Sequence, residues 1–138
     1  MIVVLDSNAA IEIVLKREKG TIFKTMIETS EKTVTSEFFR IEVANVIRKY
    51  VQGKYLAKNE GNKILELAEN LIDEFVPIKE NRLEALNEAI RLNYSAYDML
   101  YLTIARSMGA TLVTLDHGLN AIAKKEGIET ARHSLHNQ

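Results

Sequence analysis

Four acidic residues stand where carboxylates could act together, although they are far apart along the chain. Asp6 follows the apolar run Val3–Leu5, and Asp116 follows the apolar run Leu112–Leu115. If these runs are neighbouring parallel strands, both carboxylates lie at the carboxyl edge of a sheet, where open parallel sheets bind their ligands. Each acid could also be a plain helix cap, which is a common role for an aspartate after a strand.

The other two acids lie inside predicted helices. Glu42 shares a helix face with Phe38 and Val46, and a glutamate on an apolar face is costly unless it is paired or bound to a metal. The alternative is a glutamate that tilts to solvent or pairs with a nearby arginine. Asp98 follows Ser95 at the spacing of a capping box, which alone could explain it. Its helix is apolar almost all round, however, which predicts a central position near the same sheet edge.

Carboxylates gathered in one crevice repel one another, and a hard divalent cation removes that penalty. Ligation by oxygen alone favours Mg²⁺ or Mn²⁺ over zinc. The expected chemistry is attack of a metal-activated water on a phosphodiester. The residue types therefore predict a metal-dependent hydrolase whose catalytic residues and metal ligands are Asp6, Glu42, Asp98 and Asp116.

The length and composition of the chain exclude several classes of protein. The chain has 138 residues, 46% of them hydrophobic, which fits one domain with a substantial core. Its 18 basic and 19 acidic residues give a net charge of −1, which argues against coating nucleic acid by bulk charge. The absence of cysteine excludes disulfides and thiolate metal sites. Asp6 interrupts the apolar N-terminus, so neither a signal peptide nor a membrane span is expected, and we expect a cytoplasmic protein.

The remaining pattern is one of short apolar runs alternating with helical periodicity, which predicts an α/β fold with a parallel sheet. Strands are expected at Ile2–Leu5, Thr33–Thr35, Glu74–Ile78, Thr111–Leu115 and Ile128–Ala131. Helices are expected at Ala9–Leu15, Gly20–Glu28, Ser36–Val51, Lys58–Leu71, Arg82–Leu92, Ser95–Met108 and Leu119–Lys125. Pro77 marks an edge strand. We expect one domain over residues 1–132 and a polar tail over residues 133–138.

Four segments carry a resemblance to a known family. In chain order they are VLDSN at 4–8, SEFFRIEVANV at 36–46, SAYDMLYLTIA at 95–105 and ATLVTLDHGL at 110–119. This ordered set resembles the PIN-domain nucleases, and the chain looks most like the VapC-type toxins of toxin–antitoxin pairs. The resemblance covers nearly the whole chain. It implies a three-layer α/β/α domain with a central parallel sheet in the order 3-2-1-4-5.

The resemblance also implies a function and a site. Family members are metal-dependent endoribonucleases, often homodimers, and the toxins are inhibited by a cognate antitoxin. By this resemblance the four acids form the metal site, and Asn8 and Thr114 match polar positions that support it. Ser7 could support it too, or it could be a plain cap or turn residue. Some relatives carry a further acid after Asp116, about where this chain has Asn120. The number of metal ions, one or two, is therefore left open.

Other interpretations remain at this point. A phosphohydrolase of the haloacid-dehalogenase kind would use an aspartate after the first strand, but it usually needs a second aspartate where this chain has Asn8. A PIN-like module that binds RNA or a protein without cutting is another alternative, and so is a nuclease of RNA maturation. Tyr97 and Tyr101 could stack nucleobases, or they could serve packing.

Overall fold

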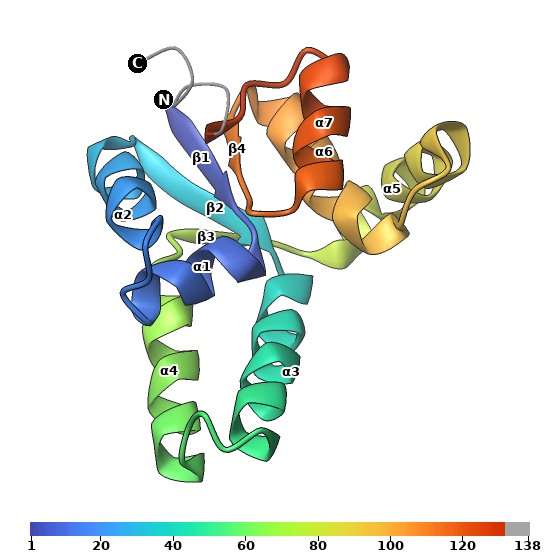
Figure 1. Ribbon diagram of the computed structural model, residues 1–138. Coiled ribbons are helices and arrows are strands. Elements are labelled where there is room, and N and C mark those ends of the chain that lie inside the picture. Colours follow the sequence, from blue (N-terminus) through green and yellow to red (C-terminus); the bar gives the residue numbers. More distant parts are fainter. Residues whose placement is uncertain (132–138) are drawn as a thin grey trace.

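The protein folds around a parallel sheet of four strands in the order β3-β2-β1-β4 (Figure 1). The computed structural model describes residues 1–131, so the tail predicted at 133–138 lies outside the described residues. The strands are β1 (Ile2–Leu5), β2 (Lys32–Ser36), β3 (Glu74–Val76) and β4 (Thr111–Val113). β1 pairs with both β2 and β4. The first and the last of these strands therefore end at the same edge of the sheet.

The fifth strand expected at Ile128–Ala131 is reduced to a single bridge. Thr130 pairs in parallel with Leu112 of β4, and the Leu112 N–H donates to the Glu129 carbonyl at 2.9 Å. Because residue 131 is already helical, the extended run is too short to continue the ladder. The order of the four strands agrees with 3-2-1-4-5, and the bridge stands next to β4 where strand 5 was expected.

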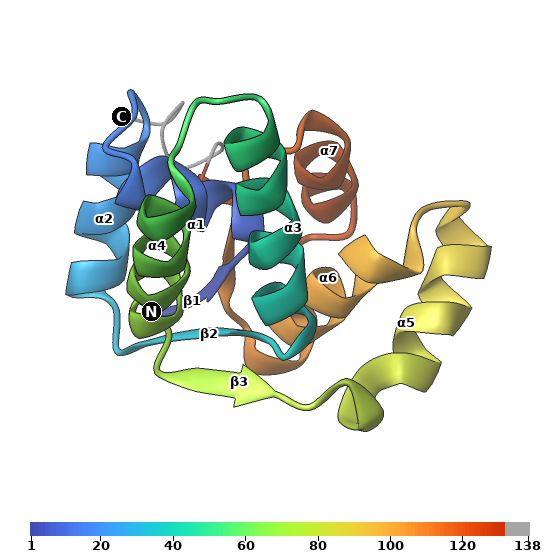
Figure 2. The same ribbon diagram turned by 90° about the horizontal axis from the view of Figure 1, so that it is seen from below.

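Helices cover both faces of the sheet and complete the three-layer fold (Figures 1 and 2). They are α1 (Ser7–Val14), α2 (Gly20–Thr29), α3 (Phe38–Gln52), α4 (Lys58–Asn70), α5 (Ile78–Leu92), α6 (Ala96–Met108) and α7 (His117–Lys125). On one side α1 packs against α2, α3 and α4, and on the other α6 packs against β1, β2 and β4 as well as α5 and α7. No helix within residues 1–131 is both long enough and apolar enough to cross a membrane.

The core follows the apolar patterns of the sequence. Val3, Val4 and Leu5 are fully buried in the central strand, as expected for a parallel sheet covered on both faces. Every residue of α6 from Met99 to Ala105 is buried, which confirms it as the central helix. Gly109 ends α6 in a left-handed conformation, with a φ of 59°, that a side chain would strain. This rigid centre fixes the start of α6 against the ends of β1 and β4.

α5 is longer than expected, because it begins at Ile78 rather than at Arg82. Pro77 ends the edge strand β3 and sits at the N-cap of α5, where its missing N–H costs nothing. Glu88 of α5 accepts hydrogen bonds from Arg91 of the same helix and from Arg106 of α6. These bonds lower the pKa of Glu88 to about 2. The charge pairs tie α5 to α6.

Candidate active site

The ends of β1 and β4 are joined by side chains as well as by the sheet. The Asp6 N–H donates to the Val113 carbonyl at 3.1 Å. Thr114 Oγ1 donates to Asp6 Oδ2 at 2.6 Å, and the Leu115 N–H donates to Asn8 Oδ1 at 2.9 Å. The carboxyl edge predicted from the two apolar runs is therefore formed. Thr114 and Asn8 form hydrogen bonds that join its two sides.

Asp6 is a buried carboxylate with an unusual ionisation. Its side chain is the N-cap of α1, where it accepts the Asn8 N–H at 3.4 Å, and the residue is only 3% exposed. Burial raises its pKa to about 7, and the charges of Glu42 and Asp98 act in the same direction. The hydrogen bonds from Thr114 and Asn8 lower the pKa but do not offset burial. The capping role of Asp6 is thus confirmed. A cap that faces solvent, however, would not have its pKa raised by burial.

Glu42 points toward the same edge from the first half of α3. Its Oε1 accepts hydrogen bonds from Ser7 Oγ at 2.7 Å and from the Tyr101 hydroxyl at 2.6 Å. The alternative of an arginine partner is wrong, because Arg40 pairs with Glu69 at 2.7 Å. Tyr101 belongs to the site although sequence reasoning assigned it only stacking or packing. Its hydroxyl reaches Glu42 from a ring that is fully buried.

Asp98 lies in the first turn of α6 and is half-buried. Its pKa is raised to about 6, chiefly by burial and further by the charges of Asp116 and Glu42. Ser95 caps the helix by accepting the Tyr97 N–H at 3.2 Å. Within residues 1–131 no hydrogen bond joins Asp98 to the Ser95 N–H, so the capping-box explanation fails. Asp98 is held close to other carboxylates without a compensating donor.

Asp116 is the N-cap of α7. Its Oδ1 accepts the Leu119 N–H at 3.0 Å and the Tyr94 hydroxyl at 3.3 Å. Burial and the charges of Asp116 and Asp98 raise the pKa of Tyr94 to about 12, so this hydroxyl stays protonated and can donate. The Asn120 amide donates to the Asp116 carbonyl at 3.0 Å and holds the corner between β4 and α7. The polar contacts therefore fix the orientation of Asp116 as well as its position.

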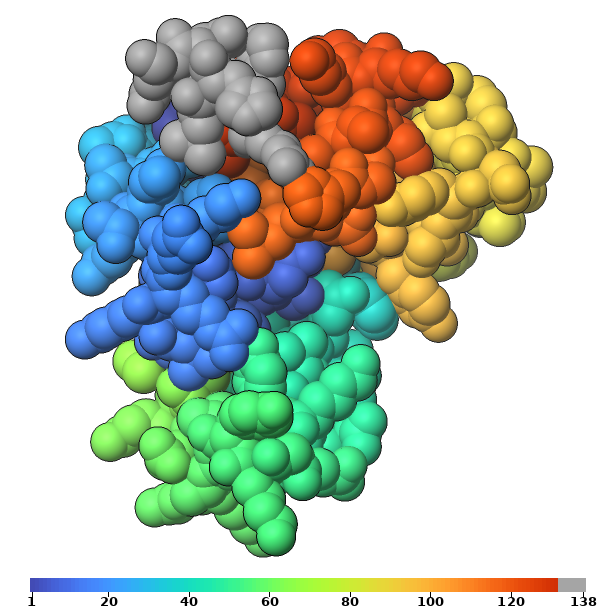
Figure 3. Space-filling view, in the orientation of Figure 1, coloured from blue at the N-terminus to red at the C-terminus, as the bar shows by residue number. Residues whose placement is uncertain are grey.

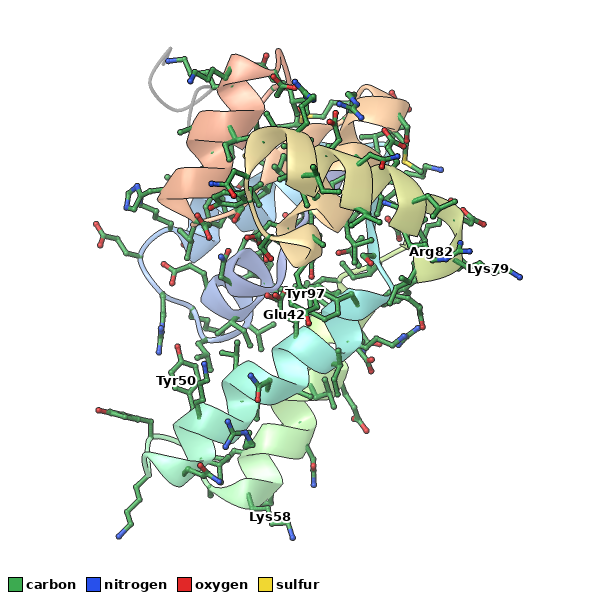
Figure 4. The ribbon with its side chains drawn as sticks, turned by 90° about the vertical axis from the view of Figure 1, so that its right-hand side faces the viewer. Glu42, Tyr50, Lys58, Lys79, Arg82 and Tyr97 are labelled. Atoms are coloured by element: carbon green, nitrogen blue, oxygen red, sulfur yellow. The ribbon has the colours of Figure 1, made fainter. Side chains whose placement is uncertain are left out.

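The four predicted acids are brought together. Asp6 is electrostatically coupled to Glu42 and Asp98, and Asp98 is coupled to Asp116 and Glu42. In the space-filling view the outline is indented between α3 and the α5–α6 pair (Figure 3). Figure 4 looks at that side of the molecule and places Glu42 where α3 meets α6. Such a cluster of carboxylates attracts cations and repels anions.

The donor chemistry of this cluster fits a hard divalent cation, because all side-chain acceptors in it are oxygens. The pKa values of Asp6 and Asp98 are raised chiefly by burial and further by neighbouring carboxylates, and a cation would offset both effects. As the side chains stand, no group of three or more His, Cys, Asp or Glu within residues 1–131 is arranged so that it could hold a metal. Glu42 is bonded to two hydroxyls and Asp116 to a helix N–H. Ion binding therefore requires these side chains to turn.

Two open grooves lie elsewhere on the described part of the chain. One has a volume of about 450 Å³ and lies between α1, α2 and α4. The other has a volume of about 340 Å³ and lies between α3 and α4. Neither is lined by any of the four acids.

Comparison with known proteins identifies the family of this chain. The PIN domain family model matches residues 3–125. The chain belongs to the PIN-domain family. It is 26% identical over 124 residues to Ribonuclease VapC3 of Pyrobaculum aerophilum, a match that covers 86% of this chain and 92% of that protein.

Two solved structures share the fold of this PIN domain. PAE2754 from Pyrobaculum aerophilum superimposes with a TM-score of 0.72 at 19% identity, covering 99% of this chain and 94% of that one. VapBC2 from Rickettsia felis, which was crystallised with a DNA fragment from its promoter, gives a TM-score of 0.67 at 15% identity. That match covers 94% of this chain and 97% of the other. At these identities the likeness establishes the fold.

The hydroxyl of Thr114 provides a direct test of the electrostatics in this PIN domain. Thr114→Val keeps the side-chain shape but removes the donor to Asp6, so the pKa of Asp6 is expected to rise further above 7. The rise should be about 1–2 pH units, because a hydrogen bond to a charged group is worth about 1.5–3 kcal/mol. The titration of the Asp6 carboxyl carbon, followed by NMR in metal-free buffer, measures it.

Thr103→Val is the matched control for this substitution. Thr103 is also buried, but its hydroxyl donates to the Met99 carbonyl inside α6. Its replacement should leave the Asp6 titration unchanged. An Asp6 midpoint that stayed in place in Thr114→Val would show that the short hydrogen bond does not tune this carboxyl.

Proposed function

We propose that this PIN domain is a metal-dependent endoribonuclease that hydrolyses RNA phosphodiesters with a metal-activated water. The observation that carries the proposal is the convergence of Asp6, Glu42, Asp98 and Asp116 at one sheet edge, with the pKa of Asp6 raised to about 7. The name of the relative VapC3, a ribonuclease, supports the same reaction.

In this proposal the four carboxylates hold Mg²⁺ or Mn²⁺. A bound ion of this kind lowers the pKa of a water ligand and offsets charge on the phosphate. Thr114 and Asn8 support the site by fixing the Asp6 side chain and the Leu115 main chain. The Ser7 and Tyr101 hydroxyls orient Glu42, and Tyr94 orients Asp116.

Hydrolysis by this set needs no histidine or serine nucleophile. When no cation is present, Asp6 is expected to be about half protonated at pH 7 and Asp98 to take up its proton at about pH 6, because burial and their neighbours disfavour the charged forms. Binding of a cation should therefore release protons, and the affinity for metal should rise with pH through this range. The rate of cleavage is expected to follow the same rise.

The experiment that tests this function is cleavage of single-stranded RNA by the purified protein with and without divalent metal. Cleavage is expected with Mg²⁺ or Mn²⁺, is expected to stop in EDTA, and is expected to return when metal is added back. RNA hydrolysis at an unchanged rate in EDTA would contradict the proposed metal dependence. RNA that is bound but never cut would support a non-cleaving PIN-like module.

We further propose that the chain is the toxin of a toxin–antitoxin pair, acts in the cytoplasm and binds a cognate antitoxin. Its likeness in fold to the VapC-containing complex of Rickettsia felis supports this role. A nuclease of RNA maturation would use the same chemistry. A small antitoxin gene directly beside the gene for this chain, whose product binds it and stops cleavage, would separate the two roles.

A homodimer is part of the same proposal. Leu83, Leu86 and Ile90 are exposed on α5 at spacings of three and four residues, so they share one face of the helix. Such an apolar stripe is typical of a surface covered by another protein. Sedimentation of the purified chain at several concentrations measures the oligomer.

A further inference from the structure

Two aromatic rings lie against each other at the margin of the acid cluster. The rings of Phe38 on α3 and Tyr97 on α6 are stacked, with centroids 4.8 Å apart and planes inclined by 14°. Tyr97 is 62% exposed, whereas Phe38 is partly buried. Because Phe38 covers one face of the Tyr97 ring, the exposed surface of Tyr97 includes its other face. A flat aromatic surface is therefore presented to solvent.

The position of this pair relates it to the proposed chemistry. Phe38 precedes Glu42 by one helical turn and so lies on the same side of α3. Tyr97 directly precedes Asp98 in the first turn of α6. The stacked rings join the start of α3 to the start of α6, and Figure 4 labels Tyr97 and Glu42 in that region. The stacked pair is therefore at the margin of the acid cluster, with Asp98 adjacent to Tyr97 in the chain and Glu42 one helical turn beyond Phe38.

The chemistry of this surface selects a particular kind of ligand. The neighbouring carboxylates disfavour anionic groups, so a phosphate would not be held here by the protein alone. A nucleobase is uncharged and flat, and every base offers a face that can stack on an aromatic ring. The stacking contact with Phe38 already orders the Tyr97 side chain, which reduces the entropy lost on binding.

We propose that the Tyr97–Phe38 pair is a stacking platform for an unpaired base of the RNA, next to the phosphodiester that is cut. This inference rests on the proposed ribonuclease function and adds a binding subsite to it. A base held on the platform would anchor the strand at the acid cluster, and duplex RNA, whose bases are already stacked, would be disfavoured. Stacking is tolerant of sequence, so the platform selects for single strands rather than for one base.

Other tyrosines of the chain do not meet the same conditions. Tyr101 is fully buried and bonded to Glu42, so it offers no face to a base. Tyr55 is 80% exposed but lies in the turn after α3, with its ring edge-on to Tyr50 at 6.4 Å. Figure 4 places Tyr50 far along α3 from Glu42. Tyr55 is therefore a matched control for an exposed aromatic ring away from the acids.

A tryptophan reporter tests the platform without relying on cleavage. The chain has no tryptophan, so Tyr97→Trp introduces a single fluorophore on the platform, and Tyr55→Trp introduces one at the control position. A short single-stranded RNA, added in EDTA to prevent cleavage, is expected to quench the reporter at position 97 and to leave the one at position 55 unchanged. An abasic strand of the same length should quench neither. Equal quenching at both positions, or quenching by the abasic strand, would overturn the proposal.

Steady-state kinetics provide the second arm of the test. Tyr97→Ala is expected to raise the KM for single-stranded RNA about ten-fold, which corresponds to about 1.4 kcal/mol, with a smaller change in kcat. Tyr97→Phe keeps the ring and should retain the wild-type KM. An unchanged KM in Tyr97→Ala would overturn the platform, and so would an altered oligomer on sedimentation, which would identify the surface as a protein interface.

The two arms separate this inference from the proposed function. If the wild-type protein cuts no RNA but the reporter at position 97 is quenched, the platform stands and the nuclease function fails. If the protein cuts RNA in a metal-dependent way while Tyr97→Ala behaves as wild type, the nuclease function stands and the platform fails.

Discussion

Asp98→Asn is expected to lower the rate of RNA cleavage by roughly 100- to 10,000-fold while the fold remains intact. The size of the loss follows from the several kcal/mol that a correctly held metal ion contributes to stabilising charge in the transition state. Asp98 is half-buried between Glu42 and Asp116, and burial together with these charges raises its pKa to about 6. The substitution therefore removes a ligand but also removes repulsion. Cleavage of a labelled single-stranded RNA in Mn²⁺, together with a thermal unfolding curve, measures both effects.

The matched control for Asp98→Asn is Asp73→Asn. Asp73 accepts the Thr33 N–H at 2.7 Å just before β3, at the opposite edge of the sheet from the acid cluster. The same chemical change there should leave cleavage within a few-fold of wild type. Equal loss of activity in both variants would indicate a general effect on folding. Near wild-type activity in Asp98→Asn would remove Asp98 from the proposed catalytic set.

Asp6→Asn should stabilise the metal-free protein above neutral pH even though it abolishes activity. The pKa of Asp6 is raised by burial from 3.8 to about 7, so the folded state keeps a proton that the unfolded state releases at lower pH. The wild-type protein is therefore expected to lose stability as pH rises from about 4 to about 7. At pH 8 the asparagine variant, which has no charge at this position, should be more stable by about 2–4 kcal/mol. Urea unfolding in EDTA at pH 4 and pH 8 measures the difference.

Divalent metal should reverse the order of stability of the wild-type protein and Asp6→Asn at pH 8. A ligand that binds only the folded state stabilises it, so Mg²⁺ or Mn²⁺ should stabilise the wild-type protein at pH 8 and have little effect on Asp6→Asn. At pH 4 the carboxyl is protonated in the folded state and about half protonated in the unfolded state, whose pKa is close to 3.8, so the difference between the variants should be small. A difference between the variants that is the same at pH 4 and at pH 8 in EDTA would show that Asp6 does not carry this ionisation penalty.

The parts of the fold that could be predicted from sequence are those in which burial leaves a simple pattern. β1, β4 and the middle of the central helix α6 are mostly apolar and buried, and that pattern located them within a few residues. The start of α5 and the loss of the fifth strand were not predicted. They depend on where Pro77 places a cap and on how soon the chain turns after Thr130. Both are decided by local geometry rather than by periodicity.

In the site, the acids and the supporting residues Asn8, Thr114 and Ser7 could be named from the sequence, but the tyrosine partners of the acids could not. Asp6 and Asp116 follow strands, and strand ends are visible in the sequence. Tyr101 reaches Glu42 across 59 positions of the chain, and Tyr94 reaches Asp116 across 22. The available signal was that the hydroxyl of a buried tyrosine needs an acceptor. That rule identifies Tyr101 as needing a partner without saying which carboxylate provides it.

The pairing of β1 with β4 has a consequence for the order of events during synthesis. During synthesis the chain emerges from the ribosome N-terminus first. Asp6 therefore emerges before Thr114, which contacts it in the folded protein, and before Asp116. A nascent chain that stops before β4 lacks both the donor to Asp6 and one of the clustered carboxylates. Synthesis must therefore have passed Asp116 before the cluster can assemble, and truncated products that end before β4 cannot carry it.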